Sequence, residues 1–149
     1  MKILFFGDIV GKIGRQAIVK VIPELKKQFQ PDFILANGEN LAHGKGITKD
    51  TAVEMIEAGI DLLTTGNHIS NKPSCVEVLQ EEDPIVIRPA NYPAGVSGLG
   101  YKVMSKDGMK IAVINLMGRV FFREDLDDPF RKLDEILAAL DRVAGENLP

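Results

Sequence analysis

The chain begins Met1-Lys-Ile-Leu-Phe-Phe-Gly-Asp-Ile-Val-Gly11, and this stretch decides the fold that the rest of the sequence predicts. Ile3 to Phe6 is a short apolar run, typical of a strand that is buried on both faces. The run stops at Gly7-Asp8, so a carboxylate follows directly on the carboxyl end of the predicted strand. Open α/β sheets bind ligands at that edge. The stretch therefore indicates an α/β fold whose first strand supplies a site residue.

The same arrangement recurs twice along the chain. The predicted strand 33–36 leads into Asn37-Gly-Glu-Asn40, and the predicted strand 60–65 leads into Gly66-Asn-His68. The carboxyl ends of parallel strands meet at one edge of a sheet. The sequence therefore predicts that the polar side chains at these positions converge there, namely Asp8, Glu39, Asn67 and His68.

Amphipathic segments separate the predicted strands. Residues 15–29 carry apolar side chains at helical spacing, and Pro23 predicts a kink or a break within them. Thr48 fits the N-cap of a second helix that reaches Ala58, with Gly59 following it. This alternation predicts βαβ units and a mostly parallel sheet.

The second half of the chain is less regular. It predicts a helix over 73–82, a strand over 84–88 and a loop over 89–100. Asp107-Gly108 predicts a tight hairpin between strands 101–105 and 109–115. Asp128 and Pro129 fit the N-cap and first position of a last helix, which Gly145 is expected to end.

Composition narrows the class of protein. With 149 residues and a net charge of -3, the chain fits one domain with no bulk attraction to extended nucleic acid. The single cysteine, Cys75, forms no internal disulfide, which fits a reducing compartment. The apolar run at the N-terminus is too short for a signal peptide, and no run approaches the ~18 residues of a membrane span. These features predict a soluble, cytoplasmic protein without a membrane partner.

Each candidate site residue also has a structural interpretation. Asp8 is about equally expected as a helix N-cap, the asparagines as turn formers, and a single His68 as a hydrogen-bonded structural residue. Glu39 has no capping role at its position. Taken together the set favours metal binding, because hard cations take carboxylate and carbonyl oxygens while imidazole suits iron, manganese and zinc.

The remaining polar candidates are weaker. Lys12 and Arg15 are candidates for contact with a substrate phosphate, and a solvated surface role is at least as expected. His43 lies in a glycine-rich polar segment and is expected to be exposed. Cys75 has no evident catalytic partner.

Together these motifs resemble those of the YmdB-type metallophosphoesterases of bacteria. The resemblance rests on Gly7-Asp-Ile-Val-Gly11, Asn37-Gly-Glu-Asn40, Gly44-Lys-Gly-Ile-Thr48, Thr65-Gly-Asn-His68, Arg88-Pro-Ala-Asn-Tyr-Pro93 and Gly118-Arg-Val-Phe121. It implies a calcineurin-like phosphoesterase sandwich with two metal ions, iron or manganese. It also implies hydrolysis of phosphodiesters, with 2′,3′-cyclic nucleotides as the favoured substrates.

The resemblance also implies roles for single residues. Asp8, Glu39, Asn40 and Asn67 would be metal ligands, with Glu39 bridging the two ions, and His68 would donate a proton to the leaving oxygen. Asn71 stands where the family usually has Asp, which predicts weaker support of His68. Family members continue beyond this length and carry further histidine ligands there. Residues 1–149 are therefore expected to form one incomplete domain, truncated after its N-terminal half and weakly active or inactive alone.

Two other functions stay open at this stage. One is a non-catalytic nucleotide- or metal-binding α/β domain that assembles with another chain, including a second copy of itself. The other is a Rossmann-like nucleotide binder that uses Asp8 and the glycines at positions 11 and 14 without two-metal chemistry.

Overall fold

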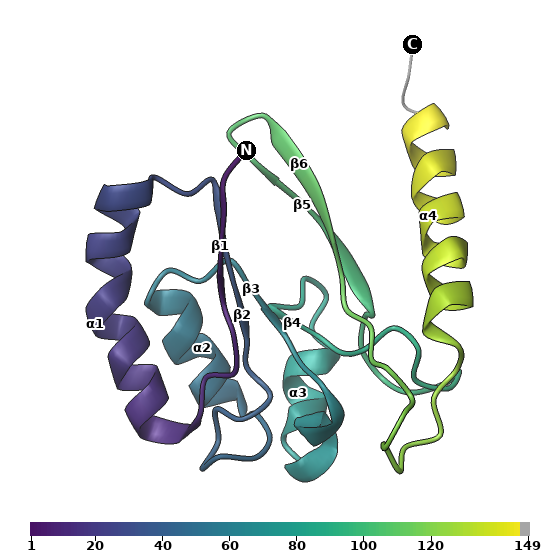
Figure 1. Cartoon of the computed structure of the whole chain (residues 1–149), viewed down its shortest axis with the longest axis horizontal. Helices are drawn as coiled ribbons and strands as arrows, with labels where there is room; N and C mark the ends of the chain where they lie inside the picture. The colour runs from purple at the N-terminus through teal and green to yellow at the C-terminus, as the bar shows by residue number, and fades with distance from the viewer. Residues whose placement is uncertain (147–149) are drawn as a thin grey trace.

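The computed structural model describes residues 1–146 as a parallel sheet, an antiparallel hairpin and four α-helices (Figure 1). The strands are β1 (Ile3–Phe6), β2 (Phe33–Asn37), β3 (Leu62–Thr64), β4 (Val86–Ile87), β5 (Tyr101–Lys106) and β6 (Met109–Ile114). The helices are α1 (Gly11–Phe29), α2 (Lys49–Glu57), α3 (Cys75–Leu79) and α4 (Pro129–Glu146), with a 3-10 helix, η1, over Asn67–Asn71.

The sheet confirms the predicted α/β class. Its strand order is β1-β2-β3-β4, and all three pairings are parallel. The register places Phe6 beside Ala36 and Asn37 beside Thr64, so the strands end at one common edge. The segments that follow β1, β2 and β3 therefore begin as neighbours.

Different elements cover the two faces of the sheet. Residues of α1, α2 and α3 pack with one face in the larger core, which includes Ile22, Met55 and Val78. On the other face, Leu35, Leu62 and Ile87 of the sheet pack against the β5–β6 hairpin. Figure 1 shows α1, α2 and α3 on one side of the sheet, and the hairpin on the other side with α4 beyond it.

The prediction that the first strand is buried on both faces was wrong. β1 is an edge strand, and Ile3 and Phe5 are 51% and 53% exposed. Leu4 and Phe6, which point the other way, pack against the helical core. An apolar run shows only that a strand can be buried. Whether each face of the strand is buried depends on whether another element of the fold covers it.

The first helix also differs from the prediction. α1 begins at Gly11 and is one helix through Pro23, so the predicted break does not occur. Within its apolar stripe only Ile18 and Ile22 are buried. Gln30 ends the helix in a left-handed conformation, with φ of 48°.

The later elements follow the prediction with shifted boundaries. Thr48 caps α2 in a reciprocal capping box with Thr51, and Asp128 Oδ1 accepts from the backbone N–H groups of Phe130 and Arg131 at the start of α4. The third and fourth strands and α3 are shorter than predicted. Gly145 does not end α4, which continues to Glu146, because a single glycine is tolerated inside a helix.

The structure confirms the hairpin predicted from Asp107-Gly108. β5 and β6 pair around Asp107 and Gly108, which both have positive φ, as a primed two-residue turn requires. Across residues 1–146, none of the helices combines the length and the apolar character needed to cross a bilayer.

We expect Gly100→Ala to destabilise the fold. A Cβ at Gly100 would clash with the Cα and Cβ of Ala90, and a backbone neighbour cannot move away at small cost. Overpacking of this kind costs about 1–3 kcal/mol. Gly118→Ala is the control, because a Cβ there meets nothing within 4 Å. Chemical denaturation of both variants gives the comparison, and equal stabilities would contradict this packing.

Candidate functional site

Backbone hydrogen bonds tie the ends of β1, β2 and β3 together. The N–H of Ile9 donates to the carbonyl of Asn37 at 3.2 Å, and the N–H of Gly11 donates to that of Asn40 at 2.9 Å. The N–H of Gly38 donates to the carbonyl of Thr64 at 2.8 Å. The loops that carry the predicted site residues are thus held against one another by their own backbone.

A chain of side-chain hydrogen bonds joins Asp8, Asn40 and His68. Asn40 Nδ2 donates to Asp8 Oδ1 at 2.6 Å, and Asn40 Oδ1 lies 2.7 Å from His68 Nδ1. Because the amide nitrogen of Asn40 is used on Asp8, its oxygen must accept, so His68 Nδ1 carries a proton. The Nε2 atom is then the ring atom left for chemistry. The structure thus brings together three residues from three loops, and two of them, Asp8 and His68, belong to the set that the sequence predicted to converge.

Glu39 lies beside this chain and is held at both carboxylate oxygens. Its Oε2 accepts from the backbone N–H of His68 at 3.2 Å, and the same oxygen is 3.9 Å from His68 Nδ1. Its Oε1 accepts from Asn37 Nδ2 at 3.4 Å, while Asn37 Oδ1 accepts from the Glu39 N–H. Asn37 therefore orients Glu39, a role that its interpretation as a turn former did not include.

Asp8 is not a helix cap. The N-cap of α1 is Val10, and α1 has no side-chain cap. Asp8 instead has a φ of 43°, which is an uncommon conformation for a non-glycine residue. Residues held in such conformations cluster at functional sites, where the surrounding structure maintains them. The structure thus favours the functional interpretation of Asp8 over the capping one.

Asn67 and Asn71 lie in η1 and are less involved than the sequence suggested. Asn67 begins η1, and its side chain forms no hydrogen bond to other residues within 1–146. Asn71 is exposed, and the hydrogen bond to the His68 ring comes from Asn40 instead. Support of His68 therefore does not depend on position 71 in this structure.

The weaker candidates take structural or surface positions. Arg15 bonds to Glu54 and to the carbonyl of Leu41, which ties α1 to α2 and to the loop after β2. Lys12 and His43 are exposed. Cys75 is buried at the start of α3, and burial raises the pKa of its thiol, which agrees with an unreactive residue.

The electrostatics of the cluster suit a cation. Asp8 and Glu39 are two carboxylates at one sheet edge, and neither has a Lys or Arg ion pair within residues 1–146. Amide oxygens and an imidazole complete a set of oxygen and nitrogen donors. The same described residues contain no group of three or more His, Cys, Asp or Glu placed to hold an ion by themselves. The donor set is therefore suitable in kind but depends on Asn40 and Asn67.

Two asparagines that the sequence did not single out as structural hold the second half of the chain beside the site. Asn115 Nδ2 donates to the carbonyl of Thr65 at 2.7 Å, at the end of β3. The buried Asn91 side chain bonds to both backbone groups of Met117 and to the carbonyl of Asp127. They fix the loop 116–127 next to the strand ends, and no local pattern in the sequence marks this long-range role.

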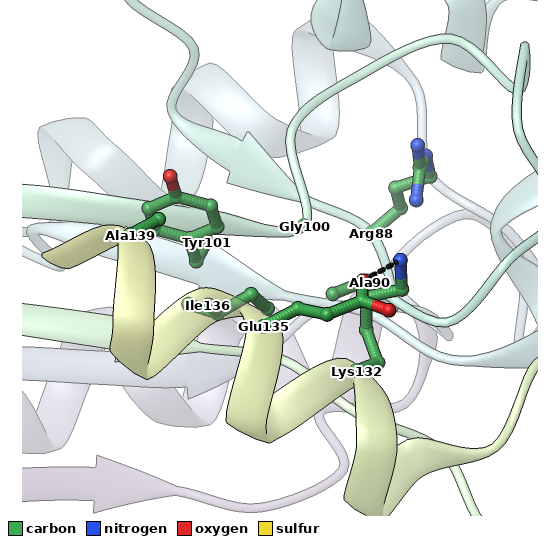
Figure 2. A pocket seen from close by; sticks show the side chains of 8 residues that line it. All are labelled: Arg88, Ala90, Gly100, Tyr101, Lys132, Glu135, Ile136 and Ala139. Atoms are coloured by element: carbon green, nitrogen blue, oxygen red, sulfur yellow. Dashed lines mark hydrogen bonds and ion pairs between the residues drawn. The ribbon is translucent and has the colours of Figure 1, made fainter.

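A cavity of about 230 Å³ lies away from this cluster, between α4 and the segment around β5 (Figure 2). Its charged groups are already paired. Arg88 donates to the carbonyls of Pro89, Val96 and Ser97, and Lys132 bonds to Glu135 within α4. Figure 2 shows Lys132 and Glu135 paired beside Ala90. The charged side chains that line the cavity are therefore already bonded within the protein.

Comparison with known proteins gives one consistent family. A family model described as YmdB-like protein matches residues 4–147. A Bacillus subtilis protein named 2′,3′-cyclic-nucleotide 2′-phosphodiesterase is 44% identical over 138 residues, which cover 93% of this chain and 52% of that protein. The chain thus spans about half the length of the curated relatives it matches.

Solved structures agree with the fold. A hypothetical protein from Thermus thermophilus has a TM-score of 0.85 at 37% identity, over 93% of this chain and 53% of that one. A phosphatase from Mycoplasma pneumoniae has a TM-score of 0.84 at 31% identity, over 93% of this chain and 51% of that one.

Gly66 gives a test of the cluster's geometry. A Cβ at Gly66 would lie 2.5 Å from Glu39 Oε2, so Gly66→Ala must displace this flexible carboxylate. We expect the affinity for Mn²⁺, measured by calorimetry, to fall roughly 10–100-fold, as when the support of a ligand is lost. The melting temperature should change little, because a side-chain end can move without disturbing the core.

Gly7→Ala is the matched control, since Gly7 directly follows β1 at the same edge and a Cβ there meets nothing within 4 Å. Equal Mn²⁺ affinities in the two variants would show that the position of Glu39 is irrelevant to cation binding.

Proposed function

Because the chain belongs to the YmdB-like protein family, we propose that it carries a metal-binding site of a phosphodiesterase. The observation that supports this most is the hydrogen-bonded chain from Asp8 through Asn40 to His68, with Glu39 beside it. It places two carboxylates and an imidazole at the ligand-binding edge of a parallel sheet. A Rossmann-like nucleotide binder does not require two carboxylates and an imidazole at one place, so this arrangement counts against that alternative.

The name of one relative supports a proposal for the class of substrate. The Bacillus subtilis protein is named for 2′,3′-cyclic nucleotides, and we propose the same class of phosphodiester for this chain. With a net charge of -3 the chain has no bulk attraction for extended nucleic acid. A small cyclic nucleotide needs only the local site.

In this proposal Asp8, Glu39, Asn40 and Asn67 would hold two metal ions, iron or manganese. Such a pair would polarise the phosphoryl group and supply a hydroxide nucleophile near neutral pH. The protein's own contribution is positional. Asn37 and the His68 N–H hold the two oxygens of Glu39, and Asn40 fixes both Asp8 and the His68 ring.

His68 is proposed as the proton donor to the leaving oxygen. Its Nδ1–H donates a hydrogen bond to Asn40 Oδ1, so Nε2 is the ring nitrogen that would deliver the proton. Nε2 carries a proton only while Nδ1 keeps its own, that is, in the imidazolium form. An imidazole can act as a general acid near neutral pH.

The exposed apolar face of β1 favours a second candidate. Ile3 and Phe5 are about half exposed on an edge strand, which can pair with another chain. A non-catalytic nucleotide- or metal-binding domain that assembles with another chain, or with a second copy, would use this edge. A clean monomer in size-exclusion chromatography would count against it.

Glu39→Gln should abolish metal-dependent hydrolysis of a phosphodiester such as a 2′,3′-cyclic nucleotide. The substitution keeps the shape of the side chain and removes its charge, so at least roughly 100-fold of activity should be lost with the metal. The exposed Glu57 of α2 provides the control, Glu57→Gln. Unchanged turnover in Glu39→Gln would overturn the proposed function.

We expect the two proposed Mn²⁺ ions to bind the 149-residue chain with different affinities, one tightly and one weakly. The sequence contains only two histidines, and His43 is exposed in the loop before α2, so two ions would share few nitrogen ligands. Equilibrium dialysis with metal analysis at increasing Mn²⁺ concentration measures the two affinities. Two ions bound with equal, high affinity would contradict this expectation, and no bound ion at any concentration would contradict the proposed metal site.

A further inference from the structure

Three lysines stand on the segments that surround the candidate site, and we call them the basic rim. They are Lys12 at the start of α1, Lys45 in the loop after β2 and Lys72 directly after η1. Within residues 1–146 none of the three forms an ion pair with a carboxylate. Four lysines elsewhere in the chain do pair with an aspartate or glutamate, namely Lys49, Lys102, Lys106 and Lys132.

The turn before α1 fixes the position of Lys12. The N–H of the preceding residue, Gly11, donates to the carbonyl of the site residue Asn40 at 2.9 Å. A Cβ at Gly11 would lie 3.7 Å from the backbone nitrogen of Gly44, so the turn also contacts the loop that carries Lys45. In Figure 1 the start of α1 and the loop after β2 lie at the same end of the sheet. Lys12 and Lys45 therefore stand on segments that touch each other.

Gly46 connects Lys45 and Lys72 to the candidate metal ligand Glu39. The N–H of Gly46 donates to the carbonyl of Glu39 at 2.6 Å. A Cβ at Gly46 would lie 2.8 Å from Lys72 Cγ, so the aliphatic stem of Lys72 crosses the backbone of this loop. Lys72 is half-buried, whereas Lys12 and Lys45 are exposed and accessible to a ligand.

The charges at this edge of the sheet divide by sign. The carboxylates of Asp8 and Glu39 attract cations and repel any phosphate that is not bound to a metal ion. The ammonium groups of the basic rim belong to the adjoining segments. Unpaired lysines beside a site raise the local concentration of anions and bond directly to phosphate oxygens. With one phosphate of a nucleotide at the metal site, the basic rim is left for a second one.

We propose that the basic rim binds a second phosphate group of the substrate, at the 5′ oxygen of the cyclic nucleotide. This rests on the proposed function, because the first phosphate must lie at the metal site. The 5′ oxygen is the ester position that remains on the ribose when the 2′ and 3′ oxygens carry the cyclic phosphate. A 5′-phosphorylated 2′,3′-cyclic nucleotide and the 2′,3′-cyclic end of a short RNA share this second phosphate.

The test compares two ligands that contain no phosphodiester bond, adenosine 3′-phosphate and adenosine 3′,5′-bisphosphate. Calorimetry measures the affinity of the Mn²⁺-loaded 149-residue chain for each. The ratio of the two affinities isolates the second phosphate. We expect the bisphosphate to bind about tenfold more tightly, as for hydrogen bonds to a charged group. This gain should shrink as salt is added, because exposed charges are screened.

The triple variant Lys12→Gln, Lys45→Gln and Lys72→Gln removes the charges of the basic rim. Glutamine keeps the Cβ and Cγ atoms of each side chain, so the contact between position 72 and Gly46 is retained. We expect this variant to bind the two ligands with nearly equal affinity. A tenfold gain that persists in the triple variant would overturn the proposal.

The matched control replaces three exposed lysines that lie on the body of α1 and on β6, namely Lys20→Gln, Lys27→Gln and Lys110→Gln. Both triple variants lose three positive charges, so their net charges are equal. The control should keep the gain from the second phosphate. If it loses the gain to the same extent as the rim variant, bulk charge is responsible and the proposal is overturned.

Adenosine 3′-phosphate separates this inference from the proposed function. If the wild type binds it in the presence of Mn²⁺ but gains nothing from the second phosphate, only the role of the basic rim is wrong. If the wild type binds neither ligand, both fail together. Where the gain is present, a dinucleotide with a 3′-phosphate identifies its source. An equal gain assigns an RNA end to the rim, and a gain restricted to the bisphosphate assigns a terminal 5′-phosphate.

Discussion

The parallel pairing of β1, β2 and β3 is the constraint on which the site depends. Its register brings three strand ends to one edge, and the backbone bonds from Ile9, Gly11 and Gly38 hold the following loops in contact. Helices cover one face of these strands and the β5–β6 hairpin covers part of the other, so this edge is fixed by the core rather than by the loops themselves. The loops can therefore contain polar and strained residues, such as Asp8 with its positive φ, without losing their positions.

Close approach is the second requirement of this edge. The carboxylate of Glu39 fills the space where Gly66 would carry a side chain, and Leu41 and Leu63 fill the space beside Gly38. Because Gly66 has no Cβ, the carboxylate of Glu39 can lie against its backbone. Because Gly38 has no Cβ, the core side chains Leu41 and Leu63 can pack against its backbone. Glu39 then bonds to the backbone of His68 across the gap between β2 and β3. The glycines thus determine the spacing of the site as well as the turns.

Asparagine amides connect the site internally. Asn40 has a donor and an acceptor on one rigid group, so it can bond to Asp8 and His68 at once and fix which nitrogen of the ring is protonated. Asn37 and Asn91 use the same property to hold Glu39 and the loop 116–127, whereas Asn115 acts as a donor to the carbonyl of Thr65. A carboxylate could not replace them, because it only accepts hydrogen bonds when ionised.

The sequence by itself determined the α/β class, the positions of most helices and strands, and the three strand ends that carry Asp8, Glu39 and His68. These features are local, since they follow from apolar runs, caps and turn residues within a few positions of each other. Only the tertiary structure decided which of them are buried and which bond to each other. It showed that β1 is an edge strand with one exposed face, that Asp8 pairs with Asn40 instead of capping α1, and that Asn37 holds the carboxylate of Glu39. Such facts depend on pairings between residues far apart in the chain, and no local pattern encodes which distant segment will cover a face or meet a side chain.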